Sequence, residues 1–110
     1  MPKYLFLQRS ARASHEPPSP AQMQEMYAKF TAWREKFAPH IVDLGGKLAA
    51  GGQVASPTEV TDGPFIELKE IVGGYMVVTA DSYEQALEIA QESPGMRPGA
   101  SIEIREIASS

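Results

Sequence analysis

The chain has 110 residues, a formal net charge of −4 and 43% hydrophobic residues, and its length predicts one domain over residues 1–110. Because it has no cysteine, disulfides, thiolate nucleophiles and cysteine-based zinc sites are excluded. The acidic balance and the scattered basic residues argue against binding to nucleic acid, because that binding needs clustered Lys and Arg. With two histidines, no apolar run long enough to cross a bilayer and no apolar leader, we expect a cytoplasmic protein with no membrane contact, no metal and no cofactor.

The first part of the chain predicts a strand, a loop and a helix. Residues 3–8 are apolar on both faces, which is typical of a central strand, and a polar loop follows over residues 9–19. Ser19, Pro20 and Gln22 together indicate a capped helix start. The helix carries one apolar stripe, which we expect to pack in the core or at a dimer interface. The stripe consists of Met23, Met26, Tyr27, Phe30, Trp33 and Phe37.

The end of this helix is marked by proline and glycine. Pro39 is expected to kink the helix, and Ile41 and Leu44 extend its apolar face until Gly45-Gly46 stops it. Two short strands are then expected, over residues 47–55 and 57–61.

A sharp turn at Asp62-Gly63-Pro64 opens the second part of the chain. Residues 65–70 then alternate apolar and charged side chains, which is the pattern of a half-buried strand. Gly73-Gly74 is expected to break this strand, and residues 75–80 form a strongly apolar one.

A second helix and a last strand complete the chain. Asp81 or Ser82 is expected to cap the helix. In the last strand, residues 101–107, Glu103 and Arg105 share one face. The helical residues expected to be buried are Tyr83, Ala86, Leu87 and Ala90.

This order of elements predicts an α+β fold of the ferredoxin-like, split β-α-β type with a mostly antiparallel sheet. Both helices should cover one face of the sheet. We expect Tyr4 or Phe6, with alternate residues of the strand 75–80, to lie on the other face. An uncovered and partly apolar face usually pairs with a second copy, so the sequence predicts a homodimer whose sheets meet face to face.

The best candidate site surrounds the Asp62 turn, where one aromatic and several ionisable side chains lie close together. Asp62 is the candidate general base, or a turn residue whose carboxylate caps backbone N–H groups. Glu67 and Lys69 share a strand face and either bind a polar ligand or form an ion pair. Arg105 either holds a carboxylate or phosphate or pairs with an acid on a neighbouring strand, such as Glu67 or Asp62. With Phe65, these residues form the predicted ligand-binding set.

The segment 60–65, with its Asp-Gly-Pro-Phe core, resembles the motif of the DGPF proteins, a branch of the YCII-related family. Matching residues continue along the second half of the chain, and the first half resembles the family more loosely through its first strand and the helix that carries Trp33. The further matching positions are Glu67, Lys69-Glu70, Gly73-Gly74, Asp81-Ser82, Glu84, Ala86-Leu87, Ala90, Pro94, Gly99 and Ile102-Glu103-Ile104-Arg105.

The resemblance implies a ferredoxin-like fold that dimerises into an α/β barrel, with a pocket in each protomer. It also implies a suspected enzymatic activity without an established substrate, and a link to sigma factors of the extracytoplasmic-function type. A His-Asp pair proposed as catalytic in the family is not carried over, because counting back from Gly46 places Glu35 at the histidine position and His40 five residues away.

Three functions follow from these observations. The first is binding of a small polar or aromatic metabolite near the Asp62–Phe65 turn, with acid–base catalysis left open. The second is a protein-interaction module for a sigma-factor-type regulator, for which Trp33 and Phe37, together with the first loop, are the candidate exposed residues. The third is a structural dimer without a ligand.

Overall fold

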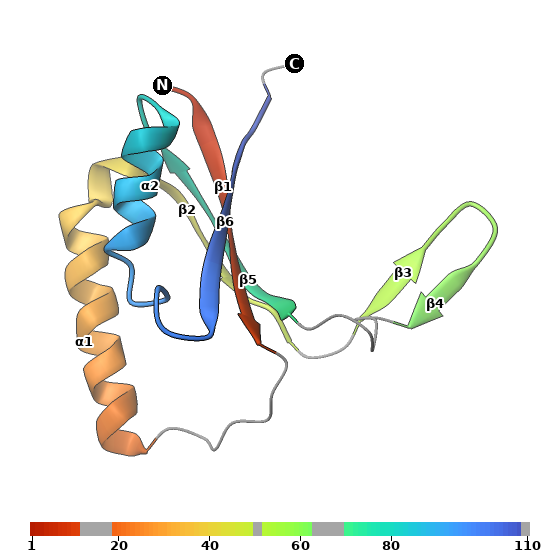
Figure 1. The fold of residues 1–110 in the computed structure, drawn as a ribbon, viewed down its shortest axis with the longest axis horizontal. Coiled ribbons are helices and arrows are strands. Elements are labelled where there is room, and N and C mark those ends of the chain that lie inside the picture. The colour runs from red at the N-terminus through yellow and green to blue at the C-terminus, as the bar shows by residue number, and fades with distance from the viewer. Residues whose placement is uncertain (12–18, 50–51, 63–69, 109–110) are drawn as a thin grey trace.

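The computed structural model describes residues 1–11, 19–49, 52–62 and 70–108, which form two layers (Figure 1). The elements are β1 (Lys3–Ala11), α1 (Pro20–Lys36), a 3-10 helix (Ala38–His40), β2 (Ile41–Lys47), β3 (Gln53–Ala55), β4 (Val60–Asp62), β5 (Glu70–Thr79), α2 (Tyr83–Gln91) and β6 (Ala100–Glu106).

The main sheet has four strands in the order β2-β5-β1-β6, and every pair is antiparallel. If these strands are numbered along the chain, the order becomes 2-3-1-4, which is the ferredoxin-like arrangement. Both helices lie on one face of the sheet (Figure 1). The α+β, ferredoxin-like prediction is therefore confirmed. We call the face without helices the open face.

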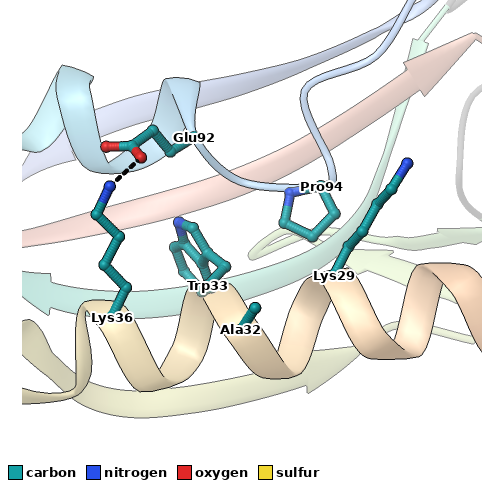
Figure 2. Close-up of a pocket in the computed structure, with 6 residues that line it drawn as sticks. All are labelled: Lys29, Ala32, Trp33, Lys36, Glu92 and Pro94. Carbon is teal, nitrogen blue, oxygen red and sulfur yellow. Dashed lines mark hydrogen bonds and ion pairs between the residues drawn. The ribbon is translucent and has the colours of Figure 1, made fainter.

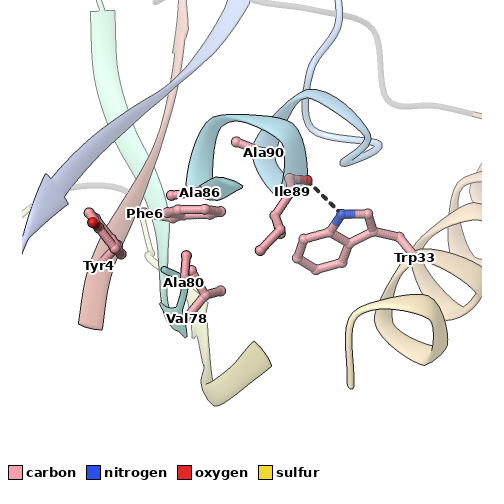
Figure 3. Close-up of a cluster of buried hydrophobic side chains, with 8 residues drawn as sticks. All are labelled: Tyr4, Phe6, Trp33, Val78, Ala80, Ala86, Ile89 and Ala90. Atoms are coloured by element: carbon pink, nitrogen blue, oxygen red, sulfur yellow. Dashed lines mark hydrogen bonds between the residues drawn. The ribbon is translucent and has the colours of Figure 1, made fainter. Parts of the chain in front are cut away.

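The core lies between the sheet and the helices (Figure 3). Tyr4 and Phe6 are buried there, which corrects the expectation that one of them lies on the opposite face. Because side chains alternate along a strand, Leu5 and Leu7 lie on the open face instead. Burial, with the nearby Glu106 carboxylate adding to it, raises the pKa of the Tyr4 phenol. The buried side chains are Tyr4, Phe6, Trp33, Val78, Ala80, Ala86, Ile89 and Ala90.

Trp33 joins the two helices. Its indole Nε1–H donates to the carbonyl oxygen of Ile89 at 2.9 Å, as Figure 3 shows. Ser93 N, which would bond to this carbonyl in a longer helix, bonds to Ala90 O instead. Trp33 is only 5% exposed and Phe37 is partly buried. The idea that these two residues form an exposed partner-binding patch is therefore wrong.

Helix α1 begins where the sequence predicts. Ser19 Oγ accepts from Gln22 N at 3.2 Å, and Gln22 Oε1 accepts from Ser19 N at 2.9 Å, which confirms the capping box. The apolar stripe is buried only at its C-terminal end, however. Helix α1 has 17 residues and is about 25 Å long, so its first half extends beyond the shorter α2. The exposed residues of the stripe are Met23, Met26 and Tyr27.

The helix does not continue beyond Phe37, and residues 41–47 form the strand β2. The sequence expectation of a helix as far as Gly45-Gly46 is therefore wrong. The β-branched pair at the start of β2, Ile41 and Val42, favours the extended conformation. Gly45 adopts a φ of +64°, and a Cβ there would lie 1.8 Å from Tyr75 O. This glycine thus permits a close approach of two strands.

Strand β5 runs through Gly73-Gly74 without a break, in contrast to the prediction. The pairing register with β1 shifts between Gln8 and Arg9, because Gln8 lies opposite Gly74 and Arg9 opposite Val72. The two glycines therefore accommodate a bulge within one strand.

The two short strands predicted before Asp62 are present in shortened form as the β3–β4 hairpin. It forms a separate ribbon that projects from the end of the main sheet (Figure 1). All of residues 52–60 are exposed. The predicted alternating strand 65–70 lies outside the described residues, except for Glu70, which begins β5.

Helix α2 is capped by Ser82, whose hydroxyl accepts from Gln85 N at 3.2 Å. Its buried face consists of Ala86, Ile89 and Ala90. Tyr83 and Leu87 flank this face and are half exposed, which corrects their predicted burial. The Tyr83 ring still packs edge-on against Tyr4 at 4.9 Å between centroids.

Candidate functional site

Two of the five predicted ligand-binding positions fall within the described residues. Asp62 is the last residue of β4, opposite Gln53 in the hairpin, and Arg105 lies in β6. Phe65, Glu67 and Lys69 lie outside the described residues and remain predictions.

Arg105 belongs to a cluster of charged side chains on the open face. Arg9 Nη1 lies 2.5 Å from Glu103 Oε1, and Arg105 Nη1 lies 3.4 Å from Glu103 Oε2. One carboxylate therefore contacts two guanidinium groups. We call Arg9, Glu103 and Arg105 the charge cluster.

The strands explain how these residues meet. Residues 103 and 105 of β6 are opposite Leu7 and Leu5 of β1, so Glu103 and Arg105 share a face as predicted. Arg9 follows Leu7 on the same face of β1. The apolar pattern of residues 3–8 predicts a loop at Arg9, whereas β1 continues to Ala11. The alternation Leu5, Leu7, Arg9 is the signal that could have found it.

The charge cluster is only partly shielded from water. The side chains of Arg9 and Glu103 are 35% and 32% exposed, and that of Arg105 is 71% exposed. Exposed pairs of this kind contribute about 0–1 kcal/mol to stability. The guanidinium group of Arg105 is accessible enough to turn toward a ligand, and its planar fork suits a carboxylate or phosphate.

Apolar side chains surround the charge cluster on the open face. Leu7 lies opposite Tyr75 and Leu5 opposite Val77, and Tyr75 is 41% exposed. Val72, opposite Arg9, is also exposed. The open face thus combines a flat apolar area with two guanidinium groups, which suits a planar ligand that carries negative charge.

The chain path connects the Asp62 turn to this site. After Asp62 the chain returns to the main sheet at Glu70, which pairs with Ala11. Ala11 is two positions beyond Arg9, a distance of about 7 Å along a strand. The described chain therefore re-enters the main sheet, at Glu70, at the end where Arg9 lies.

Neither a metal-binding cluster nor a membrane-spanning helix is present among the described residues. Across residues 1–11, 19–49, 52–62 and 70–108, no three His, Cys, Asp or Glu residues gather as a metal site would require. Within the same ranges, no helix has the length and apolar character needed to cross a membrane.

The fold and sequence define an α+β protein of the ferredoxin-like type, and a family match makes this more specific. The profile of the YCII-related domain matches residues 3–109. The chain therefore belongs to the YCII-related family.

One solved structure with a similar fold is 5-chloro-2-hydroxyhydroquinone dehydrochlorinase (TftG) from Burkholderia phenoliruptrix AC1100, in complex with 2,5-dihydroxybenzoquinone. The TM-score is 0.56 and the sequence identity 17%, over 98% of this chain and 95% of that chain. At this identity the likeness concerns the fold. No curated protein sequence matches the chain.

Proposed function

We propose that this protein binds a small polar or aromatic metabolite near the Asp62–Phe65 turn, at the end of the open face that carries Arg9. The observation that carries this proposal is the charge cluster beside exposed apolar side chains. Arg105 would hold an anionic group of the ligand, and the ring or chain of the ligand would pack on Leu5 and Leu7. The similar fold of a dehydrochlorinase bound to a quinone supports a small ring-shaped ligand.

The proposed roles of the remaining residues follow their chemistry. Asp62 is the candidate acid–base group, because the Asp-Gly-Pro turn would hold it on a rigid support. Glu67 and Lys69 would contact polar groups of the ligand, and Phe65 would contact its apolar part. Acid–base catalysis by Asp62 is the further step of this proposal.

We also propose that the site forms in a homodimer whose open faces meet in an α/β barrel. The surface of the open face supports a second copy as its cover. Leu5, Leu7, Tyr75 and Val77 give this sheet face a partly apolar character, and Tyr75 is 41% exposed. A partly apolar sheet face of this kind usually pairs with a second copy.

The first prediction concerns ligand binding. In a thermal-shift screen against a metabolite library, a ligand at 100 times its Kd should add about 2.7 kcal/mol to the free energy of unfolding. Asp62→Asn and Lys69→Met should remove this stabilisation and leave the dimer folded. Glu84→Gln, on the exposed surface of α2, removes one carboxylate elsewhere and should leave the stabilisation unchanged.

Two outcomes would contradict this assignment. Unchanged ligand binding in both variants would separate the ligand from the Asp62 turn. A screen without any ligand, together with an Asp62→Asn variant that loses only stability or dimer affinity, would favour the structural dimer without a ligand.

A second candidate function is a protein-interaction module, which the exposed start of α1 favours. Met23 and Tyr27 are 56% and 76% exposed, and Met26 lies on the same stripe. Larger apolar patches on soluble proteins often mark interaction sites. A sigma-factor-type regulator is the proposed partner by family analogy.

The second prediction tests this interaction. In a binding assay with a purified sigma factor of the extracytoplasmic-function type, Met26→Glu should weaken the complex, because it places a charge in the middle of the exposed stripe. Glu25→Gln changes the adjacent position outside the stripe and should have no effect. Failure of the wild-type protein to bind the sigma factor would contradict this function.

A further inference from the structure

A hollow of about 320 Å³ lies on the helical layer, between α1 and the segment that links α2 to β6. The sheet and the core separate it from the open face. Figure 2 shows the residues around it. The lining consists of Lys29, Ala32, Trp33, Lys36, Glu92 and Pro94. We call this space the helix-side hollow.

The helical spacing of α1 creates this hollow. Ala32 lies three positions after Lys29 and four before Lys36, and Trp33 lies four after Lys29 and three before Lys36, so these side chains project from one side of the helix. A hydrogen bond of 2.9 Å from Trp33 Nε1 to Ile89 O holds the indole in place. The short side chain of Ala32 leaves space beside the indole. Trp33 and Ala32 thus supply an apolar wall, as Figure 2 shows.

The side chains at the other boundaries are also placed by the fold. Pro94 lies across from α1, with Lys29 beside it (Figure 2). The rigid ring of Pro94 restricts the backbone of the link between α2 and β6. A volume near 300 Å³ is at the lower end of the range for small-molecule sites, so the hollow suits a single ring rather than a large ligand.

Each lysine at the hollow has a carboxylate partner. Lys36 Nζ lies 2.5 Å from Glu92 Oε1, so these two charges compensate each other. Lys29 Nζ lies 3.2 Å from Glu25 Oε1, and both side chains are about two-thirds exposed, at 64% and 67%. Such an exposed helical pair contributes little, so Lys29 can exchange Glu25 for a ligand carboxylate at small cost.

We propose that the helix-side hollow binds a small aromatic carboxylate. The carboxylate contacts Lys29, and the ring lies against Trp33 and Pro94 between the two lysine side chains. The ring is aromatic rather than aliphatic because a flat ring packs against an indole in an offset or edge-on arrangement. This site lies apart from the open face and is independent of the metabolite site proposed there.

The chain offers a direct probe, because Trp33 is its single tryptophan. Its indole N–H gives one isolated signal in a proton–nitrogen correlation spectrum. Titration with benzoate should shift this signal and saturate at millimolar concentration, as a small weak ligand does. Cyclohexanecarboxylate and benzyl alcohol, which lack the aromatic ring and the charge respectively, should bind more weakly. An equal response to all three compounds, or no saturable response to benzoate, overturns the proposal.

Variants then locate the binding site. Ala32→Leu fills the hollow and should abolish the benzoate shift, whereas Ala21→Leu on the first turn of α1 should not change it. Lys29→Gln should weaken binding roughly two- to fivefold, and Arg34→Gln, on another face of α1, should leave it unaltered. A benzoate shift that survives Ala32→Leu overturns the proposal. If Ala32→Leu does not fold, equal affinities in Lys29→Gln and Arg34→Gln overturn it instead.

Discussion

Replacing Trp33 with Ala is expected to lower the free energy of unfolding by about 3–5 kcal/mol. The Trp33 side chain is 5% exposed, and its ring lies 6.0 Å from the rings of both Phe30 and Phe37. The substitution creates a cavity and also leaves the carbonyl of Ile89 without its donor. Since small domains have a total stability of about 5–15 kcal/mol, this loss brings the chain close to unfolding. Urea denaturation followed by far-UV circular dichroism measures it.

Two further variants calibrate this loss. Trp33→Phe keeps a six-membered aromatic ring but removes the N–H and part of the ring volume, so the expected loss is about 1–3 kcal/mol, below that of Trp33→Ala. Tyr27→Ala removes an aromatic side chain from the same helix at a position that is 76% exposed, and we expect a change within about 0.5 kcal/mol. All variants are compared at one protein concentration, because dimerisation would add to the apparent stability. Equal losses for Trp33→Ala and Tyr27→Ala would contradict the assigned role of Trp33.

Helix starts were the features that the sequence predicted best, because their signals are local. The bonds between Ser19 and Gln22 join residues three positions apart. The same spacing links Ser82 to Gln85 at the start of α2. The order of elements was also sufficient to predict the ferredoxin-like sheet, since short connections leave few alternative topologies.

The errors concern strands whose partners lie far away in the chain. The sequence pattern predicts residues 41–46 as the end of a helix, but Ile41 pairs with Val78, and the helical pattern of apolar residues cannot reveal that contact. Gly45 was interpreted as a helix stop. Its positive φ instead serves the close approach to Tyr75, which depends on the register of two strands.

The candidate site shows the same contrast between local signals, which the sequence reveals, and long-range strand pairing, which it does not. Glu103 and Arg105 were assigned to one face from the alternation of their own strand, and the register with β1 confirms this. Arg9 was missed, because the pairing of β1 with both β5 and β6 extends that strand to Ala11. The sequence suggested Glu67 or Asp62 as the acid beside Arg105, whereas the described partner is Glu103. Long-range register, rather than residue type, decided these contacts.

Leu7→Glu is expected to convert the proposed dimer into monomers. Leu7 lies in β1 in the middle of the open face, between Tyr75 of β5 and Glu103 of β6. A new carboxylate there would be buried between two sheets next to the like charge of Glu103, whose carboxylate already contacts both Arg9 and Arg105. Since an uncompensated buried charge costs about 3–5 kcal/mol, the dimer dissociation constant should rise by at least roughly a hundredfold. Sedimentation velocity at several protein concentrations measures this change.

The matched control for this experiment is Leu87→Glu. Leu87 is 46% exposed on α2, in the helical layer that the proposed dimer leaves in water, so the same substitution there should leave the dissociation constant unchanged. A wild-type protein that sediments as a monomer throughout, or a Leu7→Glu variant as dimeric as the wild type, would contradict the sheet-to-sheet dimer.

The monomeric variant also tests whether the proposed metabolite site depends on the proposed dimer. If it stays folded but loses stabilisation by a metabolite, the ligand site on the open face requires both copies. If the metabolite still binds, the charge cluster and the Asp62 turn of one protomer are sufficient.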